Sequence, residues 1–170
     1  MKTRTAAFAL AVGLCLFRSL AADVQVYFSP RGGCTDAVVR ELDNARTSVL
    51  VQAYFFTSAP IAQAVVNAHR RGVSVQVVLD KISKTDRYSS ATFLYNYGVP
   101  TFIDSKHAIA HNKVMVIDGA TVLTGSFNFT RAAEESNGEN LVVIRDAATA
   151  AKYGANWKEH LAHSKPYHGN

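Results

Sequence analysis

The apolar positions of the chain follow two alternating spacings from residue 23 onward. Runs of alternating or continuous apolar residues predict strands, whereas apolar residues three and four apart predict helices. The predicted strands cover residues 24–28, 48–56, 73–79, 99–103, 112–117, 121–124 and 140–145, and the predicted helices cover residues 38–45, 61–68, 91–97 and 147–162. Helices interleaved with strands predict an α/β fold, a single-domain α-β-α sandwich with a central mixed β-sheet.

The first 22 residues do not follow this alternation. Met1 to Arg4 carry positive charge, Ala6 to Phe17 are mostly apolar, and Ser19 to Ala22 supply the small residues of a cleavage site. This order is typical of a secretory signal peptide, and the apolar stretch is too short for a stable membrane anchor. We therefore expect a signal peptide at residues 1–22, a domain at residues 23–170, and a periplasmic or secreted protein. An amphipathic first helix is the alternative.

Charge and cysteine content change once this segment is set aside. The 170-residue chain has a formal net charge of +5, and loss of Lys2, Arg4 and Arg18 together with no acidic residue leaves +2. Such a balance permits a polyanionic partner without requiring one. Cys15 also leaves, so Cys34 stands alone and the mature chain has no intramolecular disulfide.

The segment HNKVMVIDGATVLTGSFN carries polar side chains at both ends of an apolar hairpin pattern. Its Asp118-Gly119 step between two apolar runs is a strong hairpin signal. With a two-residue or a four-residue loop, alternation places the polar residues of both ends on one side of the sheet. These residues are His111, Lys113, Ser126 and Asn128. An odd-length loop or a bulge would break this arrangement, and otherwise the sequence predicts a site at the open end of the hairpin.

These groups suit the binding of a tetrahedral oxyanion such as a phosphoryl group. Lys113 offers a positive charge, while Ser126 and Asn128 offer neutral hydrogen-bond donors. Gly125 lets the backbone approach a ligand closely. His111 adds a nucleophile or proton carrier that works near neutral pH. A clamp of this kind supplies the electrostatic part of phosphoryl transfer.

The arrangement His111-x-Lys113-x4-Asp118, followed by Gly125-Ser126-x-Asn128, resembles the signature of the phospholipase D superfamily. Within that superfamily, the chain resembles the small secreted bacterial endonucleases, and this resemblance covers essentially the whole mature chain. It is carried by Ser29-Pro30-x-Gly32-Gly33, Ala53-Tyr54-Phe55-Phe56-Thr57 and Ser126-Phe127-Asn128-Phe129-Thr130. The resemblance implies cleavage of phosphodiesters of DNA, with RNA as a further candidate, through a covalent phosphohistidine and without a metal or other cofactor.

The resemblance also implies a role for each residue that matches the signature. His111 corresponds to the nucleophile, and Lys113, Ser126 and Asn128 correspond to groups that hold phosphate oxygens. Glu139, in the segment NGENLVVI, matches the acid that orients the histidine in that family.

Other polar residues permit two readings. Asp118 is either a turn former, since Asp before Gly suits any hairpin, or a catalytic support behind the site. Lys81, Lys84 and Arg87 are either a basic rim for the substrate or a solvated polar loop. We count Lys81 and Lys84 among the candidate substrate-binding residues.

Two groups of residues could in principle ligate a metal ion. They are Asp104 with His107 and His111, and His160 with His163 and His168. The spacing of the first group fits no structural zinc pattern. The second group falls at the end of a predicted helix, where cationic side chains are favoured in any case. We therefore assign no metal ligands from the sequence.

A mechanism with two histidines across one phosphorus needs more than this chain supplies, because it has a single His-x-Lys motif and no internal repeat. We expect a homodimer with the active site on the two-fold axis, as the resemblance also implies. Two alternatives to a nuclease stay open: a phospholipase D-type hydrolase of phospholipid headgroups, and a catalytically silent nucleic-acid-binding module. The absence of an evident amphipathic segment disfavours lipid docking.

Overall fold

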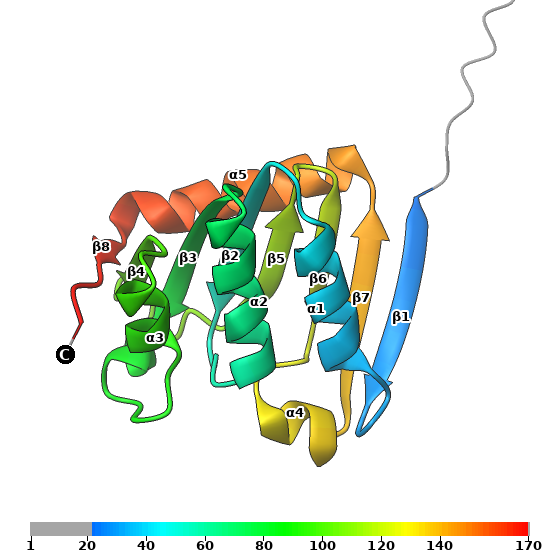
Figure 1. The fold of residues 1–170 in the computed structure, drawn as a ribbon, viewed down its shortest axis with the longest axis horizontal. Helices are drawn as coiled ribbons and strands as arrows, with labels where there is room; N and C mark the ends of the chain where they lie inside the picture. The colour runs from blue at the N-terminus through cyan, green and yellow to red at the C-terminus, as the bar shows by residue number, and fades with distance from the viewer. Residues whose placement is uncertain (1–21, 170) are drawn as a thin grey trace, which may run out of the picture.

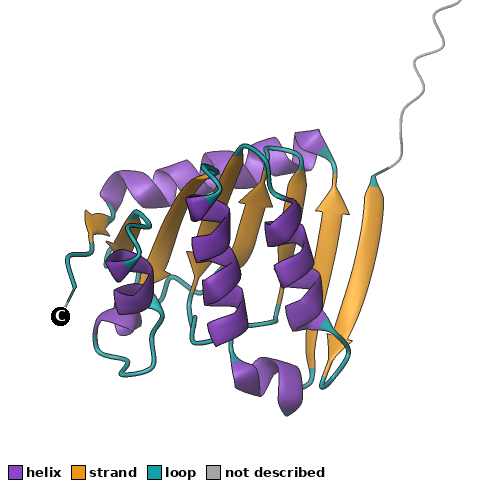
Figure 2. Ribbon diagram, viewed as in Figure 1, coloured by secondary structure: helices purple, strands orange, loops and turns teal. Residues whose placement is uncertain are grey.

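The computed structural model describes residues 22–169, which form one eight-stranded sheet with helices on both faces (Figures 1 and 2). The elements in chain order are β1 (Asp23–Ser29), α1 (Cys34–Asn44), β2 (Ser48–Ala53), α2 (Ala59–Arg70), β3 (Ser74–Asp80), the 3-10 turn η1 (Lys81–Lys84), α3 (Ala91–Asn96), β4 (Thr101–Asp104), β5 (Lys113–Ile117), β6 (Thr121–Gly125), α4 (Arg131–Glu135), β7 (Glu139–Arg145), α5 (Ala147–His163) and β8 (Lys165–Pro166). The predicted α/β sandwich with a central mixed sheet is confirmed. The predicted signal peptide lies outside the described residues, except for Ala22.

The strand order is β1-β7-β6-β5-β2-β3-β4-β8. The strands β2, β3 and β4 run parallel, and every other neighbouring pair is antiparallel. Parallel neighbours require a crossover, which α2 provides between β2 and β3. As a result, the ends of β2, β3, β4 and β6 and the beginnings of β5 and β7 all meet at one edge of the sheet. The polar residues of the predicted site lie at this edge.

Two hydrophobic layers hold the helices to the sheet. In Figure 1, α1, α2 and α3 cover the face toward the viewer, and the long helix α5 crosses the opposite face. Met115 and Ile117 of β5 belong to the larger core beneath α1 and α2, whereas Val114 and Val116 belong to a smaller core that includes Ala150 of α5. Alternate residues of β5 therefore serve opposite cores, which explains why the sequence is apolar at every position of this strand.

The hairpin between β5 and β6 departs from both predicted registers. Val114 lies opposite Thr124, and the loop has three residues, Asp118 to Ala120. Asp118 and Gly119 have φ values of 54° and 61°. The predicted two-residue or four-residue loop is wrong, and with an odd loop simple alternation no longer puts the four polar residues on one face. All four nevertheless line one cleft, described below.

Three short elements were not predicted from the sequence: η1, α4 and β8. In addition, the apolar run predicted as one strand over residues 48–56 leaves the sheet after Ala53. Beyond that point the Tyr54 N–H donates to the Asn112 carbonyl at 3.1 Å, and Phe56 forms an isolated bridge with Phe129. This departure carries Tyr54 toward the sheet edge. Among residues 22–169, no helix combines the length and the apolar character needed to cross a bilayer.

Candidate active site

A cleft of about 550 Å³ opens at the sheet edge where β5 and β7 begin and β6 ends. Its lining contains six of the residues predicted to act there: His111, Lys113, Gly125, Ser126, Asn128 and Glu139. Asn112, Val114, Thr124 and Tyr153 complete the lining. Six of the predicted residues thus line one cleft in a single chain, although the register that was expected to bring them together is not the one observed.

His111 and Lys113 are placed by the loop that enters β5. The preceding residue, Ala110, is buried and its N–H donates to a carboxylate oxygen of buried Asp80 at 2.7 Å, which fixes the approach to the cleft. The ring of Tyr54 lies 4.7 Å from that of His111, centroid to centroid. His111 itself is exposed, so its imidazole is accessible to a substrate.

Lys113 is only 6% exposed, although it is the first residue of β5. Its Nζ donates to the His111 carbonyl at 2.8 Å and lies 5.2 Å from the centroid of the Tyr54 ring. Burial lowers the pKa of Lys113, while the nearby carboxylate of Glu139 opposes that shift. A buried ammonium group with so few partners is well placed to bind an anion in the cleft.

Ser126 and Asn128 reach the cleft because the residues between and after them are anchored in the core. Phe127 and Phe129 are buried, so the alternating side chains Ser126 and Asn128 turn the other way. The backbone N–H of Asn140 and its side-chain amide both donate to the Ser126 oxygen, at 3.1 and 3.2 Å. With its acceptor capacity occupied, the Ser126 hydroxyl is left to donate toward a ligand.

The side chain of Asn128 carries a further sign of a ligand site. Its Oδ1 is buried and has no hydrogen-bond partner in the described protein. An acceptor atom that is buried without a partner costs free energy unless something donates to it. A donor of a bound ligand would satisfy this oxygen, whereas a phosphate oxygen would be bound by the NH₂ group of the same amide.

Gly125 is required by the backbone rather than by the ligand alone. Its φ is 147°, and a Cβ at this position would collide with the Asn140 carbonyl oxygen. The glycine lets β6 end against β7 and turn immediately into Ser126. The close approach at this position is between two strands of the protein, and the predicted approach of the Gly125 backbone to a ligand stays a prediction.

Glu139 begins β7 and reaches the cleft, but its contacts differ from the predicted contact with His111. Its carboxylate accepts from the Asn137 side-chain amide at 3.3 Å, and its charge favours the protonated form of Lys113. The Glu139 N–H donates to Ser29 Oγ at 3.1 Å, which ties β7 to the end of β1. These contacts place Glu139 beside the lysine, and the orientation of His111 by Glu139 stays a prediction.

Asp118 lies at the opposite end of β5 from the cleft. Its carboxylate accepts from the backbone N–H groups of Arg46, Thr47 and Ser48 at 2.7–3.2 Å. Burial would raise the pKa of Asp118, but these hydrogen bonds outweigh it and hold the pKa below its usual value. Of the two readings left open by the sequence, the structure favours a turn residue that holds the start of β2. A direct catalytic role is not supported by this position.

Lys81 and Lys84 lie in η1, outside the lining of the cleft. Lys81 Nζ donates to the carbonyl of His107 at 3.0 Å, and Lys84 lines a separate cavity of about 190 Å³ beside β8. Their predicted contact with substrate has no support within the cleft. Both lysines nevertheless follow β3 at the same sheet edge.

Sequence reasoning gave Tyr54 only a minor place and missed Asn140 and Tyr153. Tyr54 contacts both His111 and Lys113, yet its sequence context is a continuous apolar run that reads as core. Asn140 follows Glu139 directly, and Tyr153 lies on α5 with no local signal of a site. Of the two groups of possible metal ligands that received no assignment from the sequence, neither gathers as a whole among the described residues, because His111 lies in the cleft and His168 does not join His160 and His163.

The comparisons with known proteins agree with this geometry. Residues 38–161 match the family described as "Cardiolipin synthase, PLD-like domain". The chain belongs to the phospholipase D superfamily. It is 40% identical over 138 residues to a phospholipase D of Rickettsia felis, a match that covers 81% of this chain and 69% of the relative. A mitochondrial cardiolipin hydrolase of Xenopus laevis is 34% identical over 113 residues, which cover 66% of this chain and 54% of that protein.

Two solved structures of small chains share the fold. Nuc from Salmonella typhimurium, a phospholipase D family member, is 39% identical, with a TM-score of 0.84 over 87% of this chain and 99% of that chain. NucT from Helicobacter pylori, at 23% identity, has a TM-score of 0.79 over 86% of this chain and 99% of that chain. The protein is therefore a phosphodiester hydrolase of the phospholipase D superfamily, with its His-x-Lys residues in an open polar cleft.

Proposed function

We propose that this phospholipase D superfamily protein is an endonuclease of low sequence specificity that hydrolyses DNA, with RNA as a second substrate. The observation that carries the proposal is the convergence of exposed His111, buried Lys113, Ser126 and Asn128 in one open cleft. An open cleft at a sheet edge admits a long polymer that passes through it. Its donors hold a phosphate without reading a base, which predicts little sequence preference.

The proposed reaction has two steps on His111. An imidazole nitrogen attacks the phosphorus, a phosphorus–nitrogen bond forms, and the bond to the leaving oxygen breaks as a proton is delivered to that oxygen. Water then attacks the phosphorus, gives up a proton, and displaces the imidazole nitrogen. Lys113, Ser126 and Asn128 stabilise the negative charge that develops on the phosphate oxygens in both steps.

Hydrolysis of phospholipid headgroups is the second candidate, because the relatives at 40% identity carry the name phospholipase D. A direct assay separates the candidates. Mature protein is incubated with supercoiled plasmid DNA, RNA or phospholipid vesicles, with His111→Ala as the matched control. We expect nicking of plasmid and cleavage of RNA, and no headgroup release. Headgroup release with intact plasmid would assign the lipid reaction, and binding of DNA without cleavage would assign the silent binding module.

The proposed chemistry uses the charge of Lys113 in place of a metal ion. We expect plasmid cleavage to survive excess EDTA at a temperature well below the unfolding midpoint, with circular dichroism confirming that the protein stays folded. Loss of cleavage in folded, chelated protein, restored by magnesium, would contradict the metal-independent mechanism.

We further propose that the active form is a homodimer with two clefts joined on a two-fold axis, so that the partner's His111 protonates the leaving oxygen. An exposed apolar strip supports this arrangement: Val24, Val26 and Phe28 of β1 are 52%, 50% and 66% exposed. Val26 pairs with Val142 of β7, which pairs with Thr124 of β6, which in turn pairs with Val114 of β5. Thr124 and Val114 line the cleft. The strip and the cleft therefore share one sheet face.

Mixing tests the shared site. Wild-type and His111→Ala chains, combined in equal amounts and allowed to exchange, leave about a quarter of the dimers with both histidines. Activity per wild-type chain is then expected to fall by roughly half. An active monomer in sedimentation velocity, or undiminished activity after verified exchange, would rule out the shared site.

We also propose that the mature protein acts in the periplasm or outside the cell, on the strength of the signal-peptide pattern at residues 1–22. Cell fractionation followed by N-terminal sequencing is expected to recover a chain that begins at or next to Asp23. Recovery of an uncut chain from the cytosol would contradict the localisation.

A further inference from the structure

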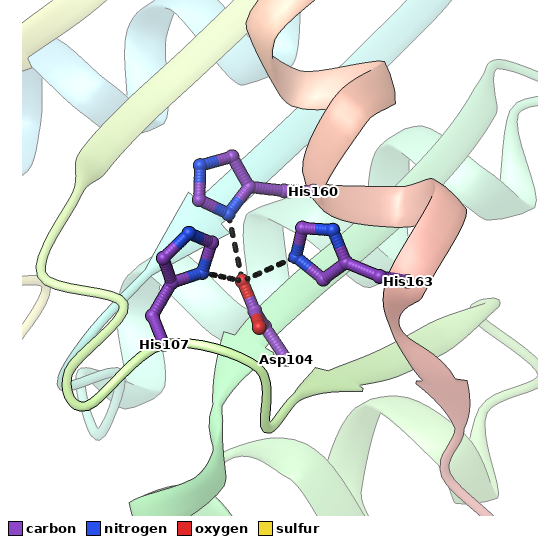
Figure 3. Close-up of side chains that lie close together, drawn as sticks. All are labelled: Asp104, His107, His160 and His163. Carbon is purple, nitrogen blue, oxygen red and sulfur yellow. Dashed lines mark hydrogen bonds and ion pairs between the residues drawn. The ribbon is translucent and has the colours of Figure 1, made fainter.

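A second cluster of chemically active side chains lies at the same sheet edge, outside the cleft. It consists of Asp104, His107, His160 and His163, whose potential ligand atoms all lie within 4.8 Å of one another. Asp104 ends β4, His107 follows in the loop toward β5, and the other two histidines project from the end of α5 (Figure 3). We call these four residues the histidine cluster.

All three imidazoles turn toward a single oxygen of Asp104. The Oδ2 atom lies 2.7 Å from His160 Nδ1, 3.1 Å from His107 Nδ1 and 3.2 Å from His163 Nε2 (Figure 3). The other oxygen, Oδ1, accepts from the Lys106 N–H at 2.9 Å. A carboxylate oxygen is well satisfied by about two hydrogen bonds. Three ring nitrogens around one fully buried oxygen are therefore more than hydrogen bonding of that atom requires.

The chemistry and separation of these groups are those of a cation site. Imidazole nitrogen and carboxylate oxygen are preferred zinc ligands, and four of them complete the tetrahedral coordination of a structural zinc ion. With zinc–ligand bonds of about 2.0–2.2 Å, neighbouring ligand atoms stand roughly 3.3–3.6 Å apart. Around an ion, the contacts of 2.7–3.2 Å to Asp104 Oδ2 would lengthen by roughly 0.1–0.9 Å, and ligand atoms that are farther apart, all within 4.8 Å of one another, would draw together.

We propose that the histidine cluster is a structural zinc site, with Asp104, His107, His160 and His163 as its four protein ligands. His160 and His163 are three residues apart on α5 and so share one helix face. The Lys106 N–H holds the second oxygen of Asp104 and thereby orients the carboxylate, as outer hydrogen bonds do around bound metals. His107, whose side chain is 43% exposed, leaves a route by which the ion enters.

The site joins two parts of the chain that are far apart in the sequence. It ties the end of β4 and the loop over residues 105–112 to the last turn of α5, and this loop leads directly to His111 in the cleft. Lys81 already holds the same loop through the His107 carbonyl. Since no cluster residue lines the cleft, the zinc ion would position this loop without contacting the substrate. This inference revises the expectation from sequence that no residue binds metal, and it is independent of the proposed nuclease activity.

Zinc binding is testable on the mature chain prepared without a polyhistidine tag and stripped with chelator. Titration with Zn²⁺ is expected to load one ion per chain and to raise the unfolding temperature, because a ligand of the folded state stabilises it. Co²⁺ is expected to load the same site and to give the intense visible bands of tetrahedral cobalt. Octahedral cobalt bands, or zinc loading well below one per chain, would overturn the assignment.

Variants separate the cluster from other histidines. His163→Ala and the more conservative His107→Gln are expected to weaken zinc binding by at least about 10–100-fold, the loss that outer-shell substitutions already cause. His168→Ala is the matched control, since this exposed histidine near the same end of the chain lies outside the cluster. Unchanged zinc affinity in folded His107→Gln, or equal weakening in the control, would overturn the proposal. Cleavage by His111 plays no part in these measurements, so the two proposals fail separately.

Discussion

The cleft and the histidine cluster share one sheet edge but surround imidazole with opposite partners. In the cleft, His111 stands beside an aromatic ring and a buried ammonium group, and the nearby donors have room for an anion. In the cluster, three imidazoles face one buried carboxylate, an arrangement that suits a cation. Histidine is therefore proposed as a nucleophile in the cleft and as a metal ligand in the cluster, because the charges of the neighbouring groups differ.

The largest expected difference between the regions is in catalysis. His111→Ala is expected to lower plasmid cleavage by at least about 10³-fold, because it removes the nucleophile. The same variant is expected to keep one zinc ion per chain, and His168→Ala is expected to keep both properties. Initial nicking rates and metal analysis on the same preparations check this. Substantial cleavage by His111→Ala would remove the distinction between the two regions.

The charge of Lys113 sharpens the comparison further. Lys113→Met is expected to lower the cleavage rate by about 10²–10³-fold, as does removal of a group that stabilises transition-state charge. The methionine side chain keeps the packing beside Tyr54, so the unfolding temperature is expected to change little. Lys158→Met, an exposed position on α5, is the control with the same change in net charge. Equal rates in the two variants would contradict an anion site at Lys113.

Dimerisation is expected to affect the cleft alone. Phe28→Glu places a charge in the exposed strip on β1 and is expected to weaken the dimer by about 30-fold, the size of a typical interface hot spot. Cleavage is expected to fall at protein concentrations where the variant dissociates, while zinc per chain stays unchanged. Tyr88→Glu, at a side chain that is 74% exposed elsewhere, is the control. A dimeric Phe28→Glu protein by sedimentation would place the interface on another surface.

Asp118 is expected to matter for stability rather than for either region. Asp118→Asn is expected to lower the free energy of unfolding by about 1–3 kcal/mol at neutral pH, because it weakens the hydrogen bonds to the start of β2. The pKa of Asp118 lies below its usual value, so this stabilisation is present above the unfolded-state pKa and is lost as pH falls through the folded-state pKa. Urea unfolding at several pH values is expected to show the two proteins converging in acid. A constant difference would refute this account.

The smallest expected effect is a shift in pH dependence. Glu139 opposes the lowering of the Lys113 pKa that burial causes. Glu139→Gln removes that support, so Lys113 is expected to lose its proton at lower pH and the alkaline limb of cleavage is expected to move toward neutrality. Rate profiles of the wild type and of Glu135→Gln, an exposed acid outside the cleft, provide the comparison. An alkaline limb that does not move would separate Glu139 from Lys113.

The local sequence determined most of the elements and the residues of the cleft. Spacing of apolar residues placed all but the short elements, because that spacing reflects which face each segment buries. The motif Gly125-Ser126-x-Asn128 marked Ser126 and Asn128 as cleft residues, and both line the cleft. The motif His111-x-Lys113 marked the site before its geometry was known.

Tertiary structure decided what depends on partners far away in the chain. The three-residue turn follows from the bond of Asp118 to the start of β2, across 70–72 residues, and this contact overrides the even loops that local turn chemistry favours. Likewise, Asp104 meets His160 across 56 residues because β4 ends where α5 ends. Local propensity acts over a few residues, whereas such contacts form only when the sheet and helices pack. The sequence therefore revealed the cleft, and only the folded chain revealed the histidine cluster.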